Sequence, residues 1–270
     1  EEAKSQSFPN WVSWVNTFTL NSCYWSTALR IYKQKAILRW KATKDTAWGG
    51  SCFGLAITNG IVFKNKAEFQ THYPSFPQFV QPNQVNSGNQ VRQTVNEIFT
   101  HQFGQQHVNY TIDSGLKKTP TMTLNRIKEL LLSDNDPVRS LTIYNNNGKG
   151  GHAIFPYRII RNSSSGDIYS LYVYDNSIPL STTPIIINTA DSNGNGSWKT
   201  TDWPGWGGTK KFFLMDPAQL YLINPSLSSI KLQGSAFELS DSILQVFQNK
   251  NCFIKIKDLN GNVTGYQNDT

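Results

Sequence analysis

Cys52 and His152 have the residue types and the surroundings needed for nucleophilic chemistry. Cys52 follows two glycines and a serine, and an apolar run begins directly after it, which predicts a cysteine at the start of a buried helix. There the helix dipole and free backbone N–H groups favour the thiolate and lower its pKa. Most cysteines are packing residues. A packing cysteine has no need of Gly49 and Gly50, whereas a loop that a substrate backbone approaches closely does.

His152 is the histidine whose surroundings suit a general base. It follows Gly150 and Gly151 and stands at the start of a predicted strand, which would hold its ring rigidly. The other histidines are expected to be surface or packing residues, because they lie in polar, loop-like stretches or at a Gln-rich helix end. They are His72, His101 and His107.

The end of the following predicted strand supplies candidates for a third group. A histidine base needs a partner that fixes its tautomer and stabilises the imidazolium. The strand over residues 169–174 ends in Asp175 and Asn176, and an antiparallel return through the turn at 162–167 brings this end back beside His152. Either side chain can then reach the ring, although the same Asp-Asn pair is also an ordinary turn signal.

Hydrophobic periodicity divides the chain into a helical part, residues 1–137, and a β-rich part, residues 138–230. Helices are expected over 53–63 and 91–103, with a third that Thr123 caps. Strands are expected over 140–144, 153–160, 169–174 and 180–188, because alternating segments are separated by Asn, Gly and Ser turns. The sequence therefore predicts an α+β fold with an antiparallel sheet. Residues 231–270 are expected to form a separate small β segment.

The order of these residues resembles the papain-like cysteine peptidase superfamily, and within it the secreted bacterial branch. The resemblance rests on Gly-Gly-Ser-Cys-Phe-Gly around Cys52, Gly-Gly-His-Ala around His152 and Tyr-Asp-Asn around Asp175. It implies a papain-like fold over residues 1–230 and hydrolysis of peptide bonds in a peptide or protein substrate. Cys52 would attack the carbonyl and His152 would carry the proton, while Asp175 or Asn176 would orient the imidazole.

The chain departs from the family pattern at several positions. Phe53 replaces the usual tryptophan, and the separation of Cys52 and His152 is shorter than the roughly 130 to 150 residues of papain-type enzymes. Thr46 stands where the family carries a glutamine that donates to the oxyanion. The backbone N–H of Cys52 is therefore the expected oxyanion donor.

Composition excludes several other classes of protein. The net charge is +7, but the basic residues are scattered rather than gathered into a stripe, which argues against a nucleic-acid partner and suits anionic cell walls or acidic substrates. No apolar run is long enough for a membrane span. Cys and His lack zinc-ligand spacing, so no cofactor is expected. Cys23 and Cys252 are expected to be buried packing residues, with a disulfide between them as the alternative.

Two other functions are compatible with the same residues. A Cys-His-Asp set can also perform amide hydrolysis or acyl transfer, as transglutaminase-like enzymes and cell-wall amidases do, because a thioester does not dictate which nucleophile resolves it. A non-catalytic surface or adhesion module is the third hypothesis. Trp198, Trp203 and Trp206 would line a cleft or, as expected more strongly, fill the core. Richness in Asn, Ser and Thr and the absence of an initial Met favour secretion or a cell-surface location.

Overall fold

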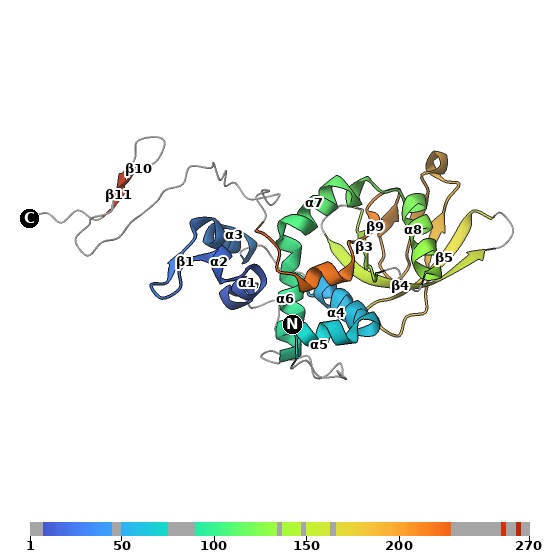
Figure 1. The fold of residues 1–270 in the computed structure, drawn as a ribbon. Coiled ribbons are helices and arrows are strands. Elements are labelled where there is room, and N and C mark those ends of the chain that lie inside the picture. The colour runs from blue at the N-terminus through green and yellow to red at the C-terminus, as the bar shows by residue number, and fades with distance from the viewer. Residues whose placement is uncertain are drawn as a thin grey trace, which may run out of the picture. The chain divides into compact units, whose positions relative to one another are not determined.

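The structure, a computed structural model, describes residues 8–44, 50–74, 90–133, 137–146, 150–162 and 166–227, and the backbone of 255–257 and 263–265. The chain separates into two compact units, Glu1–Leu232 and Gln233–Thr270. In the first unit, helices precede a large sheet (Figure 1). The second unit contains the antiparallel pair β10 (Lys255–Lys257) and β11 (Val263–Gly265), in the part where the sequence predicts a small β segment.

The first unit begins with short helices and a hairpin. Their bounds are Trp11–Phe18 (α1), Leu20–Cys23 (α2), Tyr24–Ser26 (β1), Ile31–Tyr32 (β2) and Gln34–Lys44 (α3). Trp14, Phe18, Cys23 and Ala36 form their buried core. The hairpin lies inside the part that the sequence pattern assigns to helices. It escapes periodicity because its strands are too short to show an alternating pattern.

The helix α4 (Cys52–Lys64) begins at Cys52, as the sequence predicts. It is apolar on nearly every side because it is packed between the sheet and α6 (Gln90–Thr100). Two glycines permit this close packing: a Cβ on Gly54 would overlap the carbonyl oxygen of Val95, and one on Gly60 would lie 2.6 Å from the Phe155 ring. The start of α4 is therefore held between two layers. The short helix α5 (Lys66–His72) follows.

The next helices are α7 (Gln105–Asp113) and α8 (Pro120–Leu132), with 3₁₀ turns at His101–Phe103 and Gly115–Lys117. The predicted cap of α8 is wrong. Thr119 caps the helix by accepting a hydrogen bond from the N–H of Met122, and Pro120 occupies the first turn. Thr123 lies inside the helix, and its hydroxyl donates to the carbonyl oxygen of Phe212.

Seven strands form one antiparallel sheet in the order β8-β7-β6-β5-β4-β3-β9. Their bounds are Leu141–Tyr144 (β3), Gly151–Asn162 (β4), Ile168–Tyr174 (β5), Ile185–Asn188 (β6), Ser197–Lys199 (β7), Gly207–Gly208 (β8) and Phe212–Leu214 (β9). The mixed helix and sheet content confirms the α+β class. The strand predicted over 180–188 is shorter, since β6 begins after Pro184, which has no N–H for a ladder.

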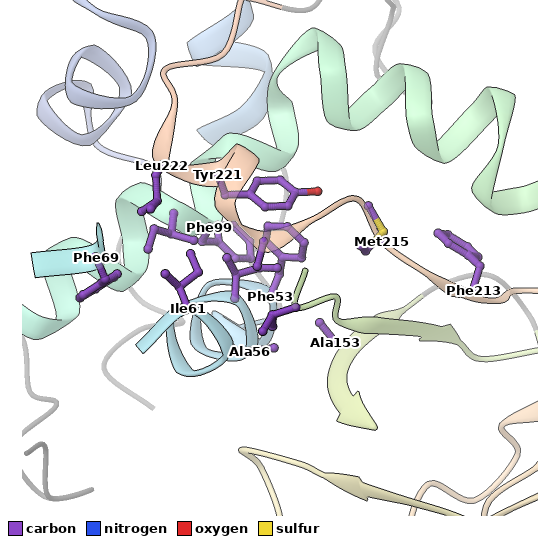
Figure 2. Packing of buried hydrophobic residues seen from close by; sticks show 14 of the residues in the cluster. Phe53, Ala56, Ile61, Phe69, Phe99, Ala153, Phe213, Met215, Tyr221 and Leu222 are labelled. Carbon is purple, nitrogen blue, oxygen red and sulfur yellow. The ribbon is translucent and has the colours of Figure 1, made fainter. Parts of the chain in front are cut away.

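Opposite faces of the sheet pack on different helices. Ala153 of β4 and Phe213 of β9 contact the α4 cluster together with the 3₁₀ helix Ala218–Leu222 (Figure 2). The next residue of β4, Ile154, points the other way and packs with Leu124 of α8. The strand β4 is thus fixed from both sides, which makes its N-terminal end a rigid support. Among the described residues, no helix is long and apolar enough to cross a membrane.

Candidate active site

Cys52 is the first residue of α4, and its surroundings leave the helix N-terminus open. Gly50 has φ +136°, a conformation that side chains disfavour. Ser51 occupies the cap position but does not cap the helix, because its hydroxyl donates instead to the side-chain oxygen of Asn96 at 3.0 Å. The backbone N–H groups of the first turn are consequently available to an anion beside the half-buried thiol.

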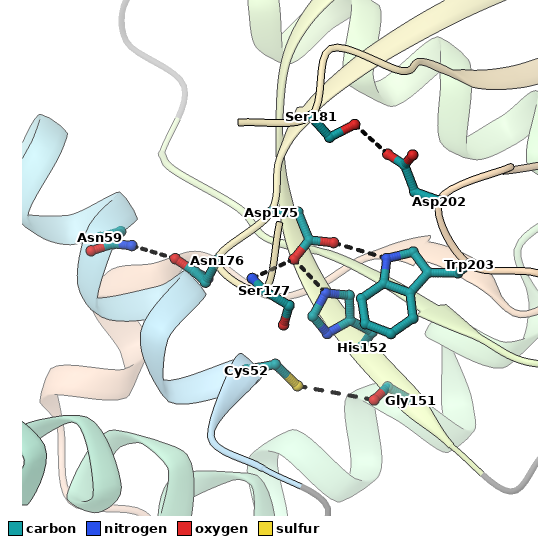
Figure 3. Close-up of polar contacts among 10 residues, drawn as sticks. All are labelled: Cys52, Asn59, Gly151, His152, Asp175, Asn176, Ser177, Ser181, Asp202 and Trp203. Atoms are coloured by element: carbon teal, nitrogen blue, oxygen red, sulfur yellow. Dashed lines mark hydrogen bonds and ion pairs between the residues drawn. The ribbon is translucent and has the colours of Figure 1, made fainter. Parts of the chain in front are cut away.

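His152 and Asp175 form a buried pair. Nε2 of His152 lies 2.8 Å from Oδ1 of Asp175, and the two residues are 5% and 4% exposed. The backbone N–H of Ser177 donates to the same oxygen at 2.8 Å. Because Nε2 carries the proton shared with the carboxylate, Nδ1 is left on the other side of the ring, where it can accept a proton. Figure 3 shows the sulfur of Cys52 on this second side of the imidazole.

Cys52 and His152 lie at the part of β4 that is not paired with β5. Pairing between these strands starts only at Phe155 and Tyr174, so β5 does not cover the edge of β4 before Phe155. Cys52 approaches this edge: its Sγ lies 4.0 Å from the carbonyl oxygen of Gly151, and the backbone N–H of Ala153 also lowers its pKa. The thiol donates to this carbonyl oxygen, and it also interacts with the imidazole of His152.

The electrostatics of the pair favour charge separation. Burial disfavours the thiolate, but the hydrogen bond and charge of His152 outweigh burial and hold the pKa of Cys52 below its usual value. Burial likewise disfavours the imidazolium, yet Asp175 and Cys52 raise the pKa of His152 to about 9. The pKa of Asp175 is lowered, against the effect of burial, by His152, the Ser177 N–H and the Trp203 indole. The two shifts act in the same direction, because each makes a thiolate paired with an imidazolium more favourable.

Asp175, not Asn176, contacts the imidazole. The side-chain oxygen of Asn176 accepts a hydrogen bond from Nδ2 of Asn59 at 2.6 Å, and Asn59 belongs to α4. Asn176 thus connects the loop after β5 to the helix that carries Cys52 (Figure 3). The two neighbouring residues therefore have different roles. The carboxylate of Asp175 orients the imidazole, and the side chain of Asn176 joins its loop to α4.

Trp203 contacts both members of the buried pair, a role that the sequence does not predict. Its indole N–H donates to Oδ2 of Asp175 at 2.9 Å, and its ring centroid lies 4.6 Å from that of His152. The ring thereby limits access of water to the imidazole. Residues 198–206 contain three tryptophans, but the spacing of these residues does not show that Trp203 reaches Asp175. Trp198 is buried and stacks on Phe212, as expected for a core residue.

Tyr144 is a second residue that sequence reasoning missed. Its ring lies against Gly151, where a Cβ would come within 2.8 Å of it. Burial, and then the negative charge of Cys52, raise the pKa of its hydroxyl, so the phenol stays neutral and remains a donor near the thiolate. Thr46, the residue at the family's oxyanion position, lies outside the described residues.

The other cysteines and histidines of the described part lie apart from this site. Cys23 is buried in the core of the first helices, and burial raises the pKa of its thiol to about 11, as expected for a packing residue. Cys252 lies outside the described residues. His72 is exposed, whereas His101 and His107 pack around Tyr221. In the ranges that the structure describes, no group of three or more His, Cys, Asp or Glu side chains could hold a metal ion.

Comparisons with known proteins add no assignment, because no family model, no curated protein and no solved structure matches the chain.

Proposed function

We propose that this protein is a cysteine peptidase with a papain-like arrangement of its active site. The observation that carries the proposal is the buried 2.8 Å contact between His152 and Asp175, aimed so that the second imidazole nitrogen faces a thiol of lowered pKa at a helix N-terminus. Such a set would supply the nucleophile, the base and the orienting group of nucleophilic catalysis.

The reaction would run through a thioester. The Cys52 thiolate attacks the carbonyl carbon of the scissile bond, and the new oxyanion is stabilised by N–H groups at the start of α4. The imidazolium of His152 then protonates the leaving amine as the C–N bond breaks. A water molecule, deprotonated by the neutral imidazole, attacks the thioester, and the departing thiolate recovers its ion pair with His152.

Asp175 would keep the imidazole in one tautomer throughout these steps. Its Oδ1 holds the Nε2 proton, so the proton that moves in the reaction is the one on Nδ1. Trp203 would hold the carboxylate in place through Oδ2. We also propose that the peptidase acts outside the cell, as the composition of the chain favours.

Activity on peptides tests the proposal directly. The full chain, incubated with denatured protein, should produce new peptide ends that mass spectrometry detects, and Cys52→Ala should produce none. A peptidyl electrophile should label Cys52 in the native chain only. Incorporation of a free amine into the substrate, with little hydrolysis, would instead support acyl transfer. Failure of Cys52 to react faster than an ordinary thiol would favour a non-catalytic module.

A further inference from the structure

The hairpin β1–β2 exposes a group of large apolar side chains. Trp25 is 69% exposed, Leu29 74% and Ile31 45%, and we call these three residues the apolar tip. Globular proteins expose single apolar residues often, but a contiguous group indicates an interaction surface. The tip belongs to a part of the chain that contributes nothing to the site around Cys52.

The pairing of the hairpin explains why these side chains point outward. Tyr24 pairs with Tyr32, and their rings, with centroids 5.0 Å apart, pack against Trp11. Ile31 alternates with Tyr32 and so points to the opposite face, and Trp25 is the extra residue where the register shifts between Tyr24 and Ser26. Lys33 lies on that face too, with its Nζ 4.8 Å from the centre of the Trp25 ring. Leu29 stands at the turn between the strands.

This part of the chain is also strongly basic. Residues 8–44 contain no Asp or Glu, and their basic residues are Arg30, Lys33, Lys35, Arg39, Lys41 and Lys44. Lys35 and Lys41 are exposed on α3, directly after the hairpin, whereas Arg39 is buried. Glu97 of α6 contacts this region at α1, where it accepts a hydrogen bond from Asn16. The charged residues of this part of the chain are therefore all basic, and Lys33 lies against Trp25 of the tip.

We propose that the apolar tip and the surrounding lysines bind the surface of a bilayer rich in anionic lipid. Tryptophan and leucine insert between headgroups, and each nearby Lys or Arg adds attraction to anionic lipid. Two such signals together give stable peripheral binding, and neither needs a membrane-spanning helix. The site around Cys52 would then act on substrates close to that surface.

The shape of the tip favours a bilayer over an acidic protein. Side chains that line a docking groove are partly shielded by the walls of the groove, whereas Trp25 in β1 and Leu29 at the turn are mostly exposed. An exposed apolar turn fits a soft layer of headgroups, into which it can sink.

Vesicle sedimentation tests this proposal with the full chain. We expect binding to vesicles of equal parts phosphatidylcholine and phosphatidylglycerol, and little binding to phosphatidylcholine alone. Trp25→Ser combined with Leu29→Ser should lower the partition coefficient about tenfold or more, through lost apolar insertion. Lys35→Glu combined with Lys41→Glu should lower it by a similar factor, and added salt should weaken the binding of the native chain.

Matched controls separate the tip from general surface hydrophobicity. Leu132 and Leu180 are 88% and 93% exposed elsewhere in the chain, and replacing both with Ser should leave the partition coefficient unchanged. The rate of Cys52 alkylation, unchanged in all variants, would show that each is folded. The proposal is overturned if the chain binds neither kind of vesicle, or binds both kinds equally. It is also overturned if the control and tip variants lose the same share of the partition coefficient, or if the chain binds soluble polyglutamate but not vesicles.

Discussion

Trp203 and Asp175 are joined by a hydrogen bond of 2.9 Å from the indole N–H to Oδ2, while Oδ1 of the same carboxylate holds His152. The two oxygens therefore have separate partners, and both partners are donors. This arrangement requires a group that accepts on both sides. A carboxylate meets that requirement, and an amide does not.

Asp175→Asn should lower kcat/KM for peptide hydrolysis about 10- to 100-fold. If the amide oxygen accepts from His152, the amide NH₂ faces the indole N–H of Trp203, and two donors then meet without an acceptor. Trp203→Phe removes the opposing donor. The double variant Asp175→Asn, Trp203→Phe should therefore lose less activity than the product of the single losses. Steady-state kinetics on all four proteins provide the measurement.

Asn176→Ala is the matched control for this cycle. It removes the hydrogen bond to Asn59 but no partner of the imidazole, so the pH dependence of kcat/KM should keep its native shape. Losses that multiply in the double variant would show that Trp203 does not act through Asp175.

The reactivity of Cys52 should persist well below pH 8.5, the value for a free thiol. The pKa of Cys52 is lowered and that of His152 is raised to about 9, so the ion pair exists between the two values. The rate of iodoacetamide alkylation should follow this lowered pKa, and His152→Ala should shift the profile toward about 8.5. A profile identical in native chain and variant would contradict the ion pair.

The pH profile of hydrolysis should be bell-shaped for the same reason. On the acid side, kcat/KM falls as the thiolate takes up a proton, and on the alkaline side it falls near pH 9 as the imidazolium loses the proton that the leaving amine needs. Alkylation, which needs only the thiolate, should show no alkaline decline. A hydrolysis rate that keeps rising above pH 9 would contradict the role of His152 as the acid.

Gly54→Ala should destabilise the first unit by about 1 to 3 kcal/mol, although alanine has the better helix propensity. A Cβ at this position overlaps the carbonyl oxygen of Val95, a backbone atom that cannot rotate away. Urea unfolding, followed by circular dichroism, measures the change. Phe63→Ala, on the same helix at an 87% exposed position, should stay within about 0.5 kcal/mol of the native chain.

Acid should destabilise the fold through His101. Burial lowers the pKa of His101 to about 3 from a model-peptide value near 6.5, so the unfolded chain takes up a proton in the interval where the folded chain does not. The free energy of unfolding therefore falls as the pH drops below 6.5, by about 2 kcal/mol per histidine between pH 6.5 and 5. His107, whose pKa burial lowers to about 4, acts in the same direction.

His101→Gln should reduce this pH dependence, and His72→Gln, at an exposed position, should not change it. Urea unfolding at pH 7, 6 and 5 compares the three proteins. Equal slopes in all three would show that His101 is not buried as a neutral imidazole.

The sequence alone determined the residue types and the local elements of the candidate site. The glycines before Cys52 and the apolar run after it predicted α4, and the turn and alternation around His152 predicted β4, since both signals are local and depend on the chain's own periodicity. The same reasoning placed Asp175 and Asn176 at the end of the next strand, where β5 ends.

Tertiary structure decided which of these groups meet. Only the place where β5 leaves β4 exposes the edge that Cys52 approaches, and only the return of the chain after β7 brings Trp203 to Asp175. The choice of Asp175 over Asn176 likewise depends on a contact with Asn59, more than a hundred residues earlier. Such contacts arise from strand register and packing between distant segments, which no local pattern encodes.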